Sequence, residues 1–399
     1  MKLFKIIKNN LNILFKISIF IWILFIPMKT SFYQISYASM ILLFLIYIFT
    51  NNKLTHFTQI LHEQKTVLIA FSFIILSMTI SNLVSPISTY LSWKTEFYYV
   101  FRYLFVFLIL LFFYKEGVFT KRFLIIAIFT ALLLQGADGI FQAIFNYDFI
   151  KNHESGLQAG LTGATFYRNT FGMFMAIGAS LSIGFIFNRK QIMLRRNDTI
   201  VLSIFFVVFI FNLIFSYSRA SWLFFVAYIG ILFLSNYKKI NRYHMLFLIS
   251  FLSIGVIIFA SNQNLLLRFH SLLEGNSSYR FEIWAYTLDM IKQKLFFGHG
   301  LMIFFDTIGK IKIGGMYHSG VHNSILEILL FLGIFGFAAY SNLLLKVLIK
   351  IISNKNTIQL ALFFAFLTIT QFDQSIIKGI VSLSPLTIFA FFIFSQDRT

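Results

Sequence analysis

The feature that most constrains this chain is a series of apolar stretches, each long enough to cross a bilayer as a helix. The hydrocarbon core of a bilayer is about 30 Å thick, so a spanning helix needs roughly 20 mostly apolar residues. Of the 399 residues 58% are hydrophobic and 12% are charged, whereas about a quarter of the residues in a soluble domain are charged. The sequence therefore predicts an all-α polytopic membrane protein, because helices satisfy every backbone polar group within lipid.

Windows of about 19 residues give roughly twelve expected spans. They are placed at 11–27, 34–50, 66–84, 97–114, 121–143, 168–187, 200–216, 221–236, 243–260, 323–349, 358–372 and 380–395. Only the short polar segment SYSRAS separates the seventh span from the eighth. The basic N-terminus is followed by an apolar run without a small-residue cleavage site, so we expect the first span to be retained.

The net charge of +19 would suggest nucleic-acid binding in a soluble protein. Here most of the Lys and Arg residues lie in the short loops on the same side as the N-terminus. This is the positive-inside pattern of membrane proteins, which predicts cytoplasmic termini and explains most of the charge without a nucleic acid partner. The chain has no cysteine, which excludes disulfides and thiolate metal sites.

One long loop, at 261–321, is expected between the ninth and tenth spans, and by this topology it faces outward. Loops of this length usually have a function or are disordered. Ser277 or Ser278 could cap a helix within it. Four apolar residues then follow at helical spacing: Phe281, Trp284, Leu288 and Ile291. We expect an amphipathic helix against the outer rim of a single transmembrane domain, 1–399.

Three arginines lie where outward-facing segments meet expected helices. Arg219 stands in SYSRASWLFF, Arg280 in the first turn of the loop helix and Arg168 in FYRNTFG. A guanidinium can bind a phosphate through two parallel hydrogen bonds, so each is a candidate substrate ligand. The alternative for Arg219 and Arg168 is an interfacial side chain at the level of the lipid headgroups. Arg280 opposes the dipole of its helix, which favours a functional role.

Two histidines in HSGVHNSILE, His318 and His322, precede the tenth span. Their spacing of four could present both to a metal on one helix face. Gly320 between them and the lack of a nearby acid or thiol argue against that site. His322 could instead be a general base, since an ordinary histidine pKa near 6.5 suits proton abstraction at neutral pH. A polar interfacial anchor is the third possibility, and Asn323 could cap the following helix.

Two acids are further candidates. Asp138 lies inside an expected span, where an ionisable group has either a functional role or a satisfied structural one. Asp373 lies at the outer end of a span and could orient a histidine or an arginine. The sequence contains no Walker loop, nucleophile elbow or HExxH helix.

The order of these features resembles the O-antigen ligase family, part of a larger group that includes the O-antigen polymerases. SRASWL precedes the long loop, YRFEIW and GHG lie within it, and VHNSILE and GIFG close it. The resemblance implies a GT-C-like, inverting glycosyltransferase that needs no metal or cofactor. Its donor would be a glycan on undecaprenyl diphosphate and its acceptor a sugar hydroxyl of lipid A–core. The site would lie on the periplasmic side of a bacterial inner membrane.

The resemblance also assigns roles. It implies that His322 is the base that acts on the acceptor hydroxyl, and that Arg219 and Arg280 bind the donor diphosphate. His318 and Arg168 are further substrate-binding candidates, on position alone. Two functions compete with ligation: polymerisation, in which the acceptor is itself lipid-linked, and transfer of the glycan to protein. A transporter of lipid-linked glycans is the alternative of a different class, although transporters usually place their substrate near the membrane midplane.

Overall fold

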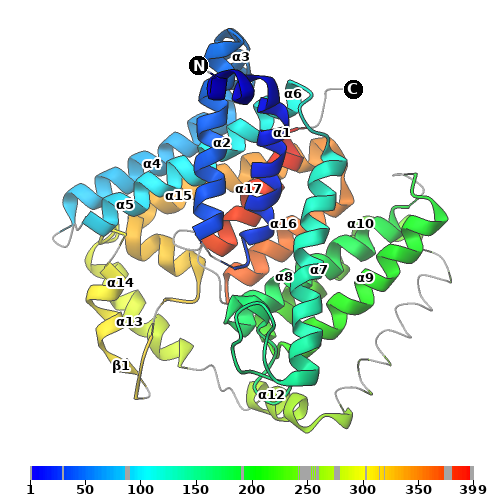
Figure 1. Cartoon of the computed structure of the whole chain (residues 1–399). Coiled ribbons are helices and arrows are strands. Elements are labelled where there is room, and N and C mark those ends of the chain that lie inside the picture. Colours follow the sequence, from blue (N-terminus) through cyan, green and yellow to red (C-terminus); the bar gives the residue numbers. More distant parts are fainter. Residues whose placement is uncertain are drawn as a thin grey trace. The chain divides into compact units, whose positions relative to one another are not determined.

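A computed structural model of the chain describes most of the residues. They are 2–28, 31–85, 90–189, 193–240, 242, 253, 255, 257, 260–273, 279–301, 303–313, 315–318, 320–372 and 380–395. The described residues are almost entirely helical, apart from one small hairpin and the loops (Figure 1). The predicted all-α class is therefore confirmed.

Seven helices among the described residues are long and apolar enough to span a membrane. They are α2 (Ser31–Thr50), α4 (Lys65–Val84), the continuous run Tyr90–Lys115, α7 (Lys121–Phe145), α8 (Arg168–Phe187), α9 (Arg196–Phe215) and α15 (Ser324–Asn354). Shorter apolar segments lie in α1 (Lys2–Phe25), α10 (Arg219–Ser235), α16 (Thr357–Thr370) and α17 (Ile380–Phe394). These eleven segments coincide with expected spans. The remaining one, 243–260, lies almost entirely outside the described residues, so a total of twelve stays a prediction.

The chain divides into two compact units. The first comprises Met1–Ala131, Glu282–Lys355 and Thr370–Thr399, and the second comprises Leu132–Phe281 and Asn356–Ile369.

The first unit contains α1, α2 and α4, together with further helices. These are α3 (Leu54–Glu63), α5 (Tyr90–Tyr99), the π-helix η1 (Val100–Phe105), α6 (Val106–Lys115), most of α13 (Arg280–Gln293), α14 (Ile303–Asp306), α15 and α17. Its hairpin pairs β1 (Lys312–Ile313) with β2 (Met316–Tyr317) in antiparallel register. Helices α1 and α2 pack together, as do α4 and α15. Phenylalanines fill much of the interior: the ring of Phe44 meets that of Phe112 edge to face at 5.3 Å.

Helix α15 is interrupted at Gly333, which has φ 66° and ψ −163°. The segment Leu295–Gly300 fits into this break. The backbone N–H of His299 donates to the carbonyl of Leu330 at 2.9 Å, and that of Ile334 donates to the carbonyl of Leu295 at 2.9 Å. These bonds satisfy backbone groups that an interrupted helix would otherwise leave without partners, which matters most in an apolar environment.

The break in α15 leads to a stability prediction for Gly333→Ala. A Cβ at Gly333 would lie 2.3 Å from the carbonyl oxygen of Phe296, and φ is in the left-handed region. We expect the midpoint of thermal unfolding in detergent to fall clearly, because strain and a backbone clash together cost more than about 2 kcal/mol. Gly230→Ala is the matched control, since nothing lies within 4 Å of a Cβ there. Equal midpoints for the two variants would contradict the prediction.

The amphipathic helix expected in the long loop is present as α13, but the predicted buried face is only partly right. Phe281 and Leu288 are 63% and 45% exposed, whereas Ile283, Thr287 and Ile291 are buried. The reason is that α13 packs into the core around α15 with its 283–287–291 row, so the two exposed residues fall on other sides of the helix. The proposed caps, Ser277 and Ser278, lie outside the described residues.

The second unit is built around α8, which packs against α9 and against α10. It also contains the C-terminal part of α7, η2 (Gly163–Thr165), η3 (Tyr237–Lys239), α12 (Gln263–Leu273) and most of α16. Glycines of α8 allow the close approach: a Cβ at Gly178 would lie 2.8 Å from the ring of Phe209. Small residues at helix contacts are typical of membrane bundles.

Candidate functional site

Each of the three candidate arginines begins a helix. Arg168, Arg219 and Arg280 are the first residues of α8, α10 and α13, and each is half-buried. A cation at the start of a helix opposes the helix dipole, so helix stability does not account for any of the three. Backbone N–H groups at a helix start favour an anion at the same place.

The first turns of α8 and α10 are in contact within the second unit. The hydroxyl of Ser221 donates to the carbonyl oxygen of Asn169 at 3.3 Å. A Cβ at Gly172 would lie 2.8 Å from the same hydroxyl, so only glycine allows this approach. Arg168 and Arg219 therefore begin two adjoining helices, which the sequence did not predict.

Polar residues of α7 hold the loop that leads to Arg168. One carboxylate oxygen of Asp138 accepts a hydrogen bond from the backbone N–H of Phe149 at 2.9 Å. The side-chain oxygen of Gln142 accepts from the backbone N–H of Thr162 at 2.8 Å. The contact of Asp138 supports its structural role, one of the two that the sequence left open. Asp373, the other acidic candidate, lies outside the described residues.

His322 lies at the entrance to α15 in the first unit. It is half-buried and adopts φ 56°, a left-handed backbone conformation that is uncommon outside glycine. Its neighbours on both sides are held: the indole N–H of Trp284 donates to the carbonyl of Val321 at 3.0 Å. The side chain of Asn323 accepts from the backbone N–H of Leu326 at 3.0 Å, which confirms Asn323 as the N-cap of α15. Such strained, well-held positions often have a functional reason.

His318 has a different environment from His322. Its Nε2 lies 3.1 Å from the carbonyl oxygen of Ile313 in β1. Because a carbonyl can only accept, this nitrogen carries a proton and donates, so it is not available as a metal ligand. In the described part of the chain, no three His, Cys, Asp or Glu side chains gather as a metal site would require.

A third histidine, His299, joins α13 to α15. It is only 6% exposed, and its Nε2 donates to the carbonyl of Met290 in α13 at 2.7 Å. Its backbone N–H bonds to α15 through Leu330. Burial lowers the pKa of the imidazole, so the ring is neutral at pH 7. The GHG motif gave the only sequence signal for this residue, whose bonds depend on distant segments.

We expect His299→Ala to lower the thermal unfolding midpoint, because the carbonyl of Met290 loses its buried donor. The folded-state pKa is depressed, so the contribution of His299 is present above the unfolded-state value of about 6.5 and is lost as pH falls through the folded-state pKa. The wild type should therefore lose stability below about pH 6.5 more steeply than the variant. His62→Ala, at an exposed histidine, is the control; identical pH slopes for wild type and His299→Ala would refute the assignment.

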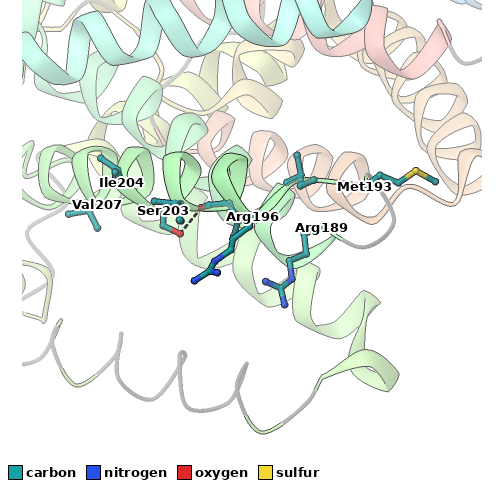
Figure 2. A pocket seen from close by; sticks show the side chains of 9 residues that line it. Arg189, Met193, Arg196, Ser203, Ile204 and Val207 are labelled. Carbon is teal, nitrogen blue, oxygen red and sulfur yellow. Dashed lines mark hydrogen bonds between the residues drawn. The ribbon is translucent and has the colours of Figure 1, made fainter.

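A pocket of about 950 Å³ lies on the second unit, between the residues that follow α8 and the N-terminal half of α9. Figure 2 shows Arg189 and Arg196 at this pocket, beside the apolar side chains of Ile204 and Val207. None of the predicted site residues lines it. The pocket is therefore distinct from the candidate site.

The candidate residues thus form two groups. Arg168, Arg219 and Arg280 belong to the second unit and His318 and His322 to the first, although α13 continues from Arg280 into the first unit.

Part of the chain is similar to a known protein family. Residues 204–341 match the family model described as O-Antigen ligase, and the search of curated proteins finds no match. The matched region contains the proposed base and the two proposed diphosphate ligands, and it excludes Arg168. It also covers α10, α13, the break in α15 and the segment that fills this break. Over residues 204–341, about a third of the 399 residues, this chain is similar to the O-antigen ligase family.

Proposed function

We propose that this protein transfers a glycan from undecaprenyl diphosphate to a sugar hydroxyl of lipid A–core, at the periplasmic face of a bacterial inner membrane. The observation that carries the proposal is the family match, because the matched stretch of sequence contains Arg219, Arg280 and His322. The apolar spans agree with a substrate that is itself a membrane lipid. The position of the two arginines at helix starts supports binding of an anionic group.

The proposed reaction needs one base and a stabilised leaving group. His322 removes the proton of the acceptor hydroxyl, and the oxygen attacks the anomeric carbon from the face opposite the lipid diphosphate. The bond between that carbon and the diphosphate oxygen then breaks, with inversion. Arg219 and Arg280 stabilise the charge that develops on the diphosphate, and no metal or cofactor is required for that role. Arg168 and His318 remain candidates for substrate binding.

The local structure supports these roles in two ways. Trp284, one turn after Arg280 on α13, bonds to the residue before His322. Asn323, the residue after His322, is held as the N-cap of α15 by its bond from the backbone N–H of Leu326. A side chain whose backbone is held on both sides keeps its geometry during the reaction, which is the requirement for a positioned base.

An acceptor assay tests this function. The purified full chain is given glycan on undecaprenyl diphosphate with either lipid A–core or a second lipid-linked glycan. We expect transfer to lipid A–core and little elongation of the lipid-linked glycan. Elongation alone would identify a polymerase and refute ligation. Movement of the donor across sealed vesicles without any transfer would instead indicate a transporter.

A further inference from the structure

A buried arginine of the first unit, Arg102, takes no part in the proposed reaction. It lies in the π-helix η1, within the span Tyr90–Lys115, and is 4% exposed. Its span is among the apolar segments long enough to cross a membrane, and an arginine in such a segment is rare and is usually paired. The π-helical turn is a second unusual feature, because such turns cost helix stability and recur at functional sites.

Arg102 has no anionic partner among the described residues. Its Nε is buried and has no hydrogen-bond partner there, and none of the ion pairs found in the described residues includes it. The nearest acid in the sequence is Glu96, whose two carboxylate oxygens accept from Thr79 and Asn82. A buried charge without a partner is costly, so the position calls for an anion.

Aromatic rings surround the face of the guanidinium. Its central carbon lies 3.7 Å from the ring centre of Tyr98 and 5.2 Å from that of Tyr37. Stacking of this kind uses the planar face of the group and leaves the N–H donors at its edge. Those edge donors match the oxygens of a phosphate, which a guanidinium binds bidentately.

We infer that Arg102, stacked on Tyr98, binds the phosphate group of a membrane lipid. A lipid is favoured because the site lies within an apolar span, where the rest of the ligand must also be apolar. By the predicted topology, Arg102 is near the outer end of its span. The shared chemistry is a lipid phosphate, and the carrier diphosphate, the phosphates of lipid A and the phosphate of a common phospholipid are its possible sources. Arg102 belongs to the first unit, whereas Arg219 and Arg280 belong to the second.

Native mass spectrometry of the full chain in detergent tests this site. The probes are undecaprenyl diphosphate, lipid A and phosphatidylglycerol, with diacylglycerol as the phosphate-free reference. We expect Arg102→Gln to retain at least one phosphate lipid about tenfold less than the wild type, which corresponds to about 1.4 kcal/mol. The lipid whose retention falls most in Arg102→Gln is the one that supplies the bound phosphate. Diacylglycerol retention should not change.

Two further variants make the result decisive. Arg102→Lys keeps the charge but lacks the paired N–H donors of the guanidinium. We therefore expect severalfold weaker retention of the phosphate lipid, with the fold intact as checked by thermal unfolding. Arg122→Gln removes an exposed arginine and should bind like the wild type. Unchanged retention of all three phosphate lipids in a folded Arg102 variant would overturn the inference. The readout is binding, so its failure is distinct from a failure of glycan transfer.

Discussion

Replacing His322 with alanine is expected to lower the rate of glycan transfer by about 10²–10⁴-fold, the range for loss of a general base. Binding of the lipid-linked donor should change little, because the arginines are assigned that role. His322 has φ 56°, and alanine is strained in that region. His322→Asn is therefore the second variant, since asparagine tolerates left-handed backbone and lacks a base.

His318→Ala is the comparison variant for His322, because His318 is a candidate for substrate binding and not for the base. The Nε2 of His318 bonds to the carbonyl of Ile313, so we expect this variant to affect the hairpin and to keep most of the transfer rate. The measurement is initial rate with purified donor and lipid A–core, alongside thermal unfolding of each variant. Full transfer by folded His322→Asn would remove His322 from the reaction. A greater loss in His318→Ala would reverse the two assignments.

Arg219→Ala is expected to lower kcat by about 10²–10³-fold, as measured for the loss of one donor to a developing charge. Arg219→Lys should recover only part of the rate, because an ammonium cannot form the bidentate contact. The rate is measured against donor concentration, which separates kcat from KM. Arg122→Ala, at an exposed position on α7, is the control for simple loss of a positive charge.

The double variant Arg219→Ala with Arg280→Ala tests whether both arginines act on one group. If they bind the same diphosphate, the loss in the double variant should be smaller than the product of the two single losses. Independent, multiplicative losses would contradict a shared diphosphate. Wild-type rates in Arg219→Ala would refute the role of Arg219 outright.

The sequence predicted those parts of the fold that depend on neighbouring residues. Span length and hydropathy are local properties, so most expected spans correspond to helices in the structure. The start of α15 could also be predicted, because a helix cap acts within one turn. The side chain of Asn323 accepts a hydrogen bond from the backbone N–H of Leu326, as expected for an N-cap. Arg168 and Arg280 were predicted at the starts of helices and Arg219 in the turn before one, and all three are the first residues of helices.

The buried face of α13 could not be predicted from the sequence in this way. Phe281 and Leu288 fit the apolar stripe as well as Ile283 does, and which row is buried depends on the distant helix that packs there. The environment of Arg102 was also hidden, since one arginine does not interrupt an apolar average over a whole span. For α13 the deciding contacts come from residues far away in the chain, whereas Arg102 combines a local π-turn and the nearby Tyr98 with the distant Tyr37.

By itself, the sequence determined the class of protein and most of the long apolar helices, and it named the candidate residues, because hydropathy, helix capping and side-chain chemistry are properties of short segments. Only the tertiary structure decided that α15 breaks at Gly333 to receive Leu295–Gly300, and that Arg168 and Arg219 begin adjoining helices. It also decided that His318 and His322 have different surroundings. These features rest on backbone hydrogen bonds and close packing between remote segments, whose partners no local pattern specifies.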